Sequence, residues 1–226
     1  GKHIVIDLDN QQSIVAHLKM TGHFFSYYET NRTSEAFDDP INGYIHHIFT
    51  FSDKTTLEFS DMRKFGWLKL MKTVDVEKHK SIAELGIDAL SRKLTEKLFH
   101  EILMRRKLRP VGVVLLEQNL IAGIGNIYRS EALFLASVLP TRKIATLTKA
   151  EWSELLPAVK KVLRHAVKLR GTSDGDFRDT DGLQGRFKRV LYVYGRTGKP
   201  CKKCGTIIER KKLGSRSIFF CSLCQH

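Results

Sequence analysis

The chain has 226 residues and carries 38 Lys and Arg against 24 Asp and Glu, which gives a formal charge of +14. Its 42% apolar and 27% charged residues are close to the average of folded proteins and exclude a disordered tail or a fibre. Apolar runs are too short for a membrane helix, and the first residues do not resemble a signal peptide, so we expect a cytoplasmic protein. Basic clusters at 105–109, 202–203 and 210–216 favour a polyanionic partner over charge that serves solubility alone.

The first part of the chain, residues 1–75, shows short runs in which apolar residues alternate with polar ones. Turn signals such as Asp9-Asn10 and Ser52-Asp53 separate these runs. Alternation with a period of two predicts strands with one buried face. We therefore expect an antiparallel sheet or β-sandwich, with strands near 4–8, 14–18, 49–51, 57–59 and 67–71.

From about Ser81 the apolar spacing changes toward a helical period, and this second part extends to residue 190. Thr148 and Glu151 form a capping box, and an apolar stripe follows from Trp152 to Val167, with Pro157 expected to bend the helix. Shorter helices are predicted over 95–104, 113–118 and 127–136. The region 76–190 is therefore predicted to be a helical domain.

The last part, residues 191–226, holds all the cysteines of the chain. Cys201 and Cys204 form one Cys-x-x-Cys pair, Cys221 and Cys224 form a second, and sixteen residues separate the pairs. This spacing is typical of four thiolates around one structural Zn²⁺, and a chain without an export signal is unlike a disulfide protein. Two strands, 206–212 and 216–220, are predicted between the pairs, so the segment should form a zinc-ribbon hairpin with a basic tip.

The segment from Leu115 to Tyr128 contains Gly123 and Gly125, which allow a tight turn before a helix that Asn126 opens. Such a helix start, with unpaired backbone amides and a side-chain amide, suits a phosphate group. A Gly-x-Gly sequence alone is a weak signal and favours an ordinary turn between two helices.

Four motifs in one order resemble the formamidopyrimidine-DNA glycosylase (Fpg/MutM) family. They are His17-Leu-Lys-Met-Thr-Gly22, Asp61-Met-Arg-Lys-Phe-Gly66, Ala122-Gly-Ile-Gly-Asn-Ile-Tyr128 and the segment from Tyr194 to Cys201. The resemblance extends from Lys2 to Gln225. It implies an α+β multidomain fold made of a β-sandwich incomplete at its N-terminus, a helix–two-turns–helix domain and a zinc-ribbon hairpin.

The resemblance further implies a base-excision repair enzyme that removes oxidised purines, such as 8-oxoguanine and formamidopyrimidines, from duplex DNA and cuts the abasic strand. In the family, a methionine and an Arg-x-Phe loop fill the gap left by the extruded base, and these map to Met20, Arg63 and Phe65. Taken singly and without the motif, Met20 and Phe65 favour core packing. The resemblance gives DNA contacts to His17, Tyr44, Lys107, Asn126 and Tyr128, catalytic roles to Lys2 and Arg216, and a lesion-capping role to the loop 172–186.

Three positions depart from the family pattern. The family nucleophile, an N-terminal proline followed by glutamate, belongs to a segment ahead of Lys2 and outside this sequence. We therefore expect either an incomplete piece of a full glycosylase or a short form that binds damaged DNA without excising bases. Tyr44 stands where the family has a DNA-contacting histidine, and Gly112 stands where it has a lysine, which bears on the choice of oxidised base.

Two alternatives from other classes remain open on the sequence alone. A zinc-ribbon module that binds DNA or RNA without catalysis would also be basic and carry four cysteines, and a ribosome-associated zinc protein is favoured by charge. Neither needs Met20 or the loop with Arg63 and Phe65. The expected partner is duplex DNA with an oxidised purine or abasic site, bound by a monomer associated with the bacterial nucleoid and not with a membrane.

Overall fold

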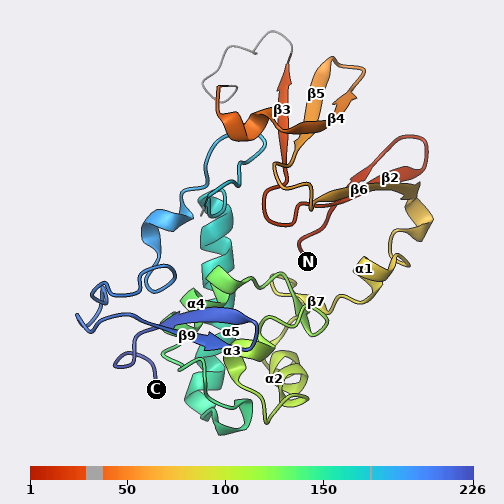
Figure 1. Cartoon of the computed structure of the whole chain (residues 1–226). Helices are drawn as coiled ribbons and strands as arrows, with labels where there is room; N and C mark the ends of the chain where they lie inside the picture. Colours follow the sequence, from red (N-terminus) through yellow and green to blue (C-terminus); the bar gives the residue numbers. More distant parts are fainter. Residues whose placement is uncertain (29–37, 174) are drawn as a thin grey trace. The chain divides into compact units, whose positions relative to one another are not determined.

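The computed structural model describes residues 1–28, 38–173 and 175–226. Contacts divide the chain into two compact units, shown in Figure 1. The sheet unit comprises Lys2–Ala83 and Ala166–Arg189, and the helical unit comprises Gly1, Glu84–His165 and Val190–His226. Each unit has its own buried residues and is described by itself.

Within the described part of the sheet unit, six strands form two three-stranded antiparallel sheets. One sheet has the order β1-β2-β6 and the other the order β3-β5-β4 (Figure 1). The strands are β1 (Ile4–Asp7), β2 (Gln12–His17), β3 (His23–Tyr28), β4 (Ile45–Thr50), β5 (Thr55–Ser60) and β6 (Trp67–Lys72). The antiparallel sheets expected from the alternating pattern are confirmed. Strand β3 was not predicted, because its first three residues are all buried and show no alternation.

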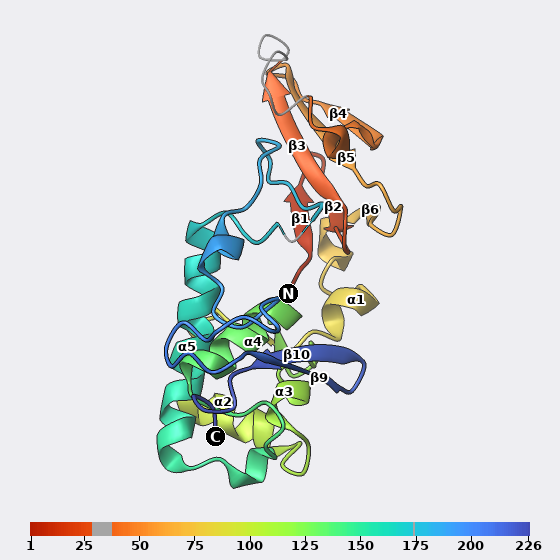
Figure 2. The same ribbon diagram turned by 60° about the vertical axis from the view of Figure 1, so that its left-hand side comes forward.

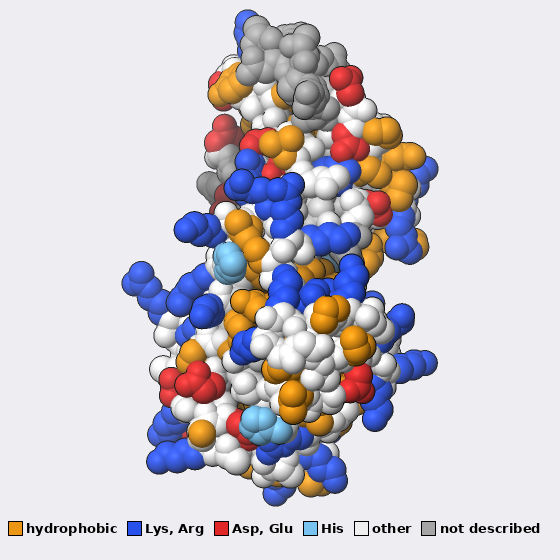
Figure 3. All heavy atoms as spheres, turned by 90° about the vertical axis from the view of Figure 1, so that its left-hand side faces the viewer, with side chains coloured by type: hydrophobic (Ala, Val, Ile, Leu, Met, Phe, Trp, Pro, Cys, Tyr) orange, Lys and Arg blue, Asp and Glu red, His pale blue; other side chains and the backbone are white. Residues whose placement is uncertain are grey.

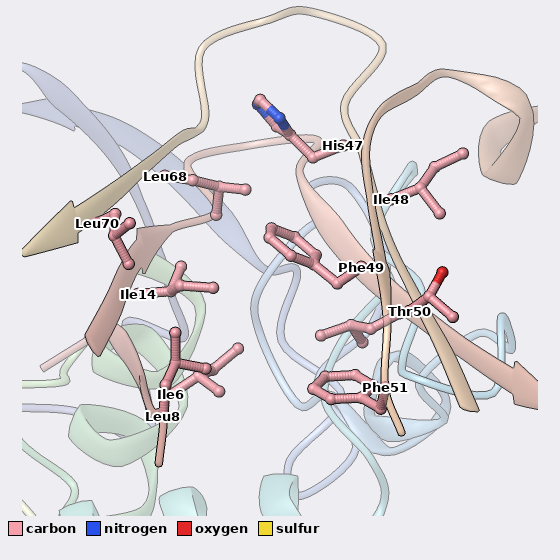
Figure 4. Close-up of a pocket in the computed structure, with 11 residues that line it drawn as sticks. Ile6, Leu8, Ile14, His47, Ile48, Phe49, Thr50, Phe51, Leu68 and Leu70 are labelled. Carbon is pink, nitrogen blue, oxygen red and sulfur yellow. The ribbon is translucent and has the colours of Figure 1, made fainter. Parts of the chain in front are cut away.

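An apolar core joins the strands of the sheet unit, with Ala16, Phe24 and Phe59 at its centre. Beside this core lies an open cavity of about 610 Å³, which we call the sheet groove. Figure 4 shows Ile6, Ile14 and Leu70 on one side of it and Phe49 and Phe51 on the other. His47 is the one ionisable group among the described residues that line the groove. The sheet unit therefore has an apolar surface open to solvent.

The main helices of the helical unit follow the sequence expectations with small changes in their ends. They are α2 (Glu96–Met104), α3 (Val111–Val114), α4 (Asn126–Leu135) and α5 (Lys149–Lys168), whose last residues belong to the sheet unit. The Thr148 amide donates to Glu151 at 2.7 Å and the Glu151 amide donates to Thr148 Oγ1 at 3.3 Å, so the capping box is confirmed. Helix α3 is shorter than predicted and begins directly after Pro110. The short helix α1 (Lys80–Ala83) lies in the sheet unit, and β7 (Ile87–Asp88) pairs in parallel with β8 (Ile121–Ala122).

The end of the chain forms the expected hairpin, with β9 (Glu209–Leu213) paired to β10 (Arg216–Phe220). Leu213 pairs with Arg216, so the turn consists of Gly214 and Ser215, and Gly214 has a φ of +63° that favours glycine. Strand β10 packs on α4 within the helical unit (Figure 2). In the described ranges, no helix combines the length and the apolar character needed to cross a membrane.

Candidate nucleic-acid interface and metal centre

The four cysteines come together at the base of the hairpin. The ligand atoms of Cys201, Cys204, Cys221 and Cys224 all lie within 4.8 Å of one another. Cys201 Sγ and Cys224 Sγ are 3.9 Å apart, and Cys204 Sγ and Cys221 Sγ are 3.4 Å apart. Four sulfurs at these separations fit the tetrahedral coordination of one structural Zn²⁺, with no position left for a reacting water.

The acid–base chemistry of the cluster also suits a cation. Hydrogen bonds from Thr206 lower the pKa of the Cys204 thiol to about 6, so this sulfur favours the thiolate at neutral pH. Burial and the neighbouring cysteines raise the pKa of the Cys224 thiol to about 12. A bound divalent cation would offset the repulsion between neighbouring cysteine thiolates and would favour deprotonation of the coordinating thiols.

In the sheet unit, the turn that carries Met20 is bonded to the loop that carries Arg63 and Phe65. The Thr21 hydroxyl donates to Asp61 Oδ1, and the Arg63 amide donates to Thr21 Oγ1 at 3.3 Å. Met20 is 62% exposed and Phe65 is 56% exposed, so neither side chain packs in the core. The Arg63 guanidinium lies 4.7 Å from the centre of the Phe65 ring. Two apolar groups and one cation thus share an exposed surface.

Asp61 organises this loop, and the sequence interpretation gave it no role. Its buried carboxylate accepts hydrogen bonds from the amides of Gly66 at 2.6 Å and Arg63 at 3.2 Å, in addition to Thr21. Burial alone would raise the pKa of Asp61, but these hydrogen bonds hold it below its ordinary value. An aspartate two residues before Arg63 was the available signal, since short acidic side chains commonly bond nearby backbone amides.

The charge of Lys2 acts on His17, while Tyr44 lies directly before β4. Burial, followed by the positive charges of Lys19, His3 and Lys2, lowers the pKa of His17 to about 4. His17 Nδ1 accepts a hydrogen bond from the Lys19 amide at 3.0 Å, which requires an unprotonated nitrogen. The Tyr44 side chain is exposed, and its carbonyl accepts from the Asp61 amide at 2.9 Å. Each of these residues belongs to the sheet unit.

The loop 172–186, of which residue 174 lies outside the described residues, belongs to the sheet unit and is bonded to the rest of it. Arg178 Nε donates to Asp39 Oδ2 at 2.7 Å, and the Arg178 side chain is almost fully buried. The Ser26 amide donates to the Thr180 carbonyl at 2.8 Å, and Asn42 Nδ2 donates to the Gly182 carbonyl at 3.4 Å.

In the helical unit, the residues predicted to contact phosphate lie on α4, on the segment after α2 and on β10. Asn126 opens α4, and no side chain caps that helix start. Gly123 has a φ of +100° and its amide donates to Gln118 Oε1 at 3.0 Å, so of the two turn glycines Gly123 uses the left-handed conformation. Lys107 and Arg216 are exposed. Lys and Arg dominate the charged side chains on the face drawn in Figure 3.

Position 112 has no room for a side chain. The Gly112 amide donates to the Pro140 carbonyl at 3.0 Å, and a Cβ at Gly112 would lie 2.8 Å from that oxygen. The Gly112 carbonyl instead accepts from Arg129 Nη1 at 2.6 Å. The positively charged group next to Gly112 is therefore the Arg129 guanidinium of α4.

Comparisons with known proteins agree with these features. The formamidopyrimidine-DNA glycosylase N-terminal domain matches residues 1–68, the H2TH domain matches 85–177, and a zinc finger found in FPG and IleRS matches 198–226. The formamidopyrimidine-DNA glycosylases of Exiguobacterium sp. and Pelotomaculum thermopropionicum are 36% and 38% identical over 225 residues, covering 100% of this chain and 78% of each relative. The chain belongs to the formamidopyrimidine-DNA glycosylase family.

Solved structures of Fpg proteins share its fold. MutM (Fpg) from Thermus thermophilus matches with a TM-score of 0.84 and 35% identity, covering 100% of this chain and 80% of that one. Lactococcus lactis Fpg, solved with DNA containing an abasic site, matches with a TM-score of 0.84 and 29% identity, covering 79% of that chain. The predicted Fpg fold and the four-cysteine zinc site of this Fpg-family chain are thereby confirmed.

Proposed function

We propose that this Fpg-family chain is a base-excision repair glycosylase with abasic-site lyase activity that acts on oxidised purines in duplex DNA. The observation that carries the proposal is the exposed surface of Met20, Arg63 and Phe65, fastened by Thr21 and Asp61. Large apolar side chains held out into solvent on a braced loop suit insertion into a base stack.

Extrusion of a base costs a few kcal/mol and leaves a gap in the helix. Met20 and Phe65 would fill this gap, because both side chains are apolar and the Phe65 ring is flat. Arg63, whose guanidinium lies over the Phe65 ring, would donate to the cytosine left without its partner. The described geometry thus supports a role for each of the three side chains.

Phosphate contacts would come from both units. We assign them to His17 and Tyr44 in the sheet unit, and to Lys107, Asn126 and Tyr128 in the helical unit. Charged and neutral hydrogen-bond donors and helix starts fix a protein on the duplex without reading its sequence, and His17 would contribute as a neutral donor. The loop 172–186 would cover the extruded base, with Arg178 holding it to the sheet unit through Asp39.

The chemistry expected for the family begins when an amine attacks C1′ of the damaged nucleotide. The bond from C1′ to the base breaks, the base leaves with a proton, and an iminium forms. Loss of a proton from C2′ then breaks the bond to the 3′ oxygen. We propose that Lys2 assists this elimination and that Arg216 holds the departing phosphate, since a guanidinium is a poor proton donor at neutral pH.

We propose three functional regions for the chain: residues 1–75 as the β-sandwich, 76–190 as the helix–two-turns–helix domain and 191–226 as the zinc finger. The zinc ion would brace the hairpin that presents Arg216. We further propose that the chain acts as a monomer on chromosomal DNA in the cytoplasm.

The proposal is tested with a duplex that carries one 8-oxoguanine opposite cytosine. Base release and strand cleavage are followed on gels, and affinity is measured for a duplex with a tetrahydrofuran abasic-site analogue and for its undamaged counterpart. Substitution of Met20, Arg63 and Phe65 together by alanine should lower the preference for the abasic duplex roughly tenfold or more. An unchanged preference would overturn the proposal.

A matched control replaces one aromatic, one aliphatic and one cationic residue that are also exposed in the sheet unit, namely Tyr28, Val74 and Lys78. This triple alanine variant should keep the wild-type preference. Strong binding of the abasic duplex without base release would support the alternative of a short form that binds damaged DNA but does not excise. Preference for RNA over both duplexes would instead support the ribosomal alternative.

A further inference from the structure

Arg129 is a fully buried arginine on α4 that joins three parts of the helical unit. Nη1 donates to the Gly112 carbonyl of α3 at 2.6 Å. Nη2 donates to Asn126 Oδ1 at 2.5 Å and to the Ser217 carbonyl of β10 at 3.0 Å. The side chain has 0% exposure, and Nε has no hydrogen-bond partner among the described residues.

The charge of Arg129 is not balanced by an acid. Its hydrogen-bond acceptors are two carbonyls and one amide, and no carboxylate in the described residues forms an ion pair with it. Burial lowers the pKa of Arg129 to about 10, Tyr194 partly offsets this effect, and the nearby charge of Arg216 adds to it. The group remains a cation at neutral pH, beside a second cation.

A buried unpaired cation is a costly way to hold a fold together, because well-packed apolar residues of similar volume are often as stabilising or more so. Two arginines near each other at an uncapped helix start leave a local excess of positive charge. An anion bound at this place would supply the missing countercharge.

The hydrogen bond to Asn126 also fixes which way that side chain faces. A guanidinium has donors and no acceptor, so Asn126 must present its amide oxygen to Arg129. Its NH₂ group is then directed away from Arg129 as a donor. The hydrogen bond from Arg129 to the Ser217 carbonyl attaches β10, the strand that begins with Arg216, to the same guanidinium.

We propose that Arg129 is a positioning residue for DNA phosphate binding: it orients the Asn126 amide as a donor, fixes β10 beside α4 and places a buried positive charge behind the bound phosphate. This inference rests on the proposed function and adds a residue that touches neither base nor sugar. Its role is distinct from a purely structural one because it concerns the charge and orientation of the binding groups.

The test compares Arg129→Met, which removes the charge, with Arg129→Lys, which keeps the charge but loses the forked donor set. The control is Arg142→Met, because Arg142 also forms several hydrogen bonds in the helical unit, to Glu151, Thr146 and His226. Each full-length variant is checked for one Zn²⁺ per chain and for its urea unfolding midpoint. Affinity for the tetrahydrofuran duplex and for undamaged duplex is then measured over a range of salt concentrations.

For Arg129→Met we expect affinity to fall roughly tenfold on both duplexes alike, because phosphate contacts carry no sequence information. The slope of log K against log salt should become shallower by about 1. Arg129→Lys should keep the wild-type slope but lose several-fold in affinity, since the amide of Asn126 is no longer oriented. Arg142→Met should change stability without changing affinity or slope.

Wild-type affinity and slope in Arg129→Met would overturn the inference while leaving the proposed function intact. An equal loss of affinity in Arg142→Met would also overturn it, because the effect would then follow from stability. If Arg129→Met does not fold, the affinity of Arg129→Lys for duplex DNA provides the test. Wild-type affinity in Arg129→Lys would overturn the positioning role. Failure of the wild type to bind either duplex would instead overturn the proposed function.

Discussion

At the end of β2, the His17 ring lies in a crowded aromatic and basic environment. Its centre is 4.7 Å from that of the His3 ring and 6.2 Å from that of Trp67. Burial and the neighbouring positive charges lower its pKa from 6.5 to about 4. The folded chain therefore holds this ring neutral under conditions in which an exposed histidine would be charged.

This depression makes stability depend on pH in a defined window. Between pH 4 and pH 6.5 the unfolded chain binds more protons at His17 than the folded chain does, so stability falls as the pH is lowered through that window. We expect His17→Asn to lose less stability than the wild type between pH 7 and pH 5. Urea unfolding midpoints at both values measure the difference, with His226→Gln, an exposed histidine, as the control. Equal losses in His17→Asn and the wild type would contradict the assignment.

At the scale of single residues, local spacing predicted the metal site but not the buried network of Arg129. A spacer of two residues brings the sulfurs of a cysteine pair together through local geometry alone, independently of the rest of the fold. The Arg129 partners Gly112 and Ser217 are 17 and 88 positions away, so only tertiary structure brings them together. The exposure of Met20 and Phe65 also required the structure, because the same residue types are common in cores.

Among the elements, α4 and the segment that leads to the zinc finger are connected by Glu131. Its buried carboxylate accepts from three consecutive amides, those of Tyr192 at 2.7 Å, Val193 at 3.0 Å and Tyr194 at 2.9 Å. Burial raises the pKa of Glu131 above its ordinary value although these amides oppose the shift. The hairpin thus has a polar anchor in addition to its apolar contacts.

Glu131→Gln should weaken this anchor, because the new NH₂ group faces amide donors and leaves at least one of them unsatisfied. We expect the free energy of unfolding to fall by about 1–3 kcal/mol. Glu154→Gln on the exposed side of α5 should change it by less than about 0.5 kcal/mol. Urea unfolding of both variants at neutral pH makes the comparison, and equal stability would contradict the anchoring role.

The ion pair of Arg178 with Asp39 gives the loop 172–186 its attachment to the sheet unit. Arg178 Nη1 also donates to the carbonyls of Gly175 and Phe177, both at 3.0 Å. Burial would raise the pKa of Asp39, but the hydrogen bond from Arg178 holds it below its ordinary value. The carboxylate is therefore charged at neutral pH, and the attachment is lost only in acid, as the pH falls through that depressed pKa.

Arg178→Met should release the loop without unfolding the sheets. We expect chymotrypsin to cleave after Phe177 roughly tenfold faster than in the wild type, since local opening governs such cleavage. Mass spectrometry of the fragments locates the cut, and Arg189→Met, an exposed arginine of the same unit, serves as the control. A cleavage rate equal to that of the wild type would show that other contacts hold the loop.

Prediction of the element type succeeded where apolar residues recur with a regular period along the chain and failed where they do not. The stripe of α5 and the alternation near β2 and β6 gave the correct element types. Strand β3 was missed because its residues lack a clear period, and α3 was predicted over 113–118, whereas it covers Val111–Val114 directly after Pro110.

For the molecule as a whole, the metal is expected to determine whether the hairpin keeps its shape. Cys201 and Cys221 are packed with Phe134, Val193 and Ile208 in one buried cluster. Removal of zinc would leave four thiols crowded together, two of them in this cluster, next to the strand that carries Arg216.

Chelation should therefore lower affinity for duplex DNA roughly tenfold or more, with recovery on addition of Zn²⁺ but not of Mg²⁺. Fluorescence anisotropy of a labelled duplex reports the affinity, and a chromogenic chelator reports one ion released per chain. Cys221→Ser should behave like the chelated wild type. Full affinity after complete zinc release would contradict this role.

The sheet groove has a practical consequence for work with the protein in solution. Attraction between apolar surfaces weakens on cooling and strengthens on warming toward ambient temperature. Solutions kept on ice should stay clear, whereas the same samples should become turbid when warmed and clear again when chilled. A lysine in place of Leu70, which is 56% exposed at the groove, should suppress that clouding.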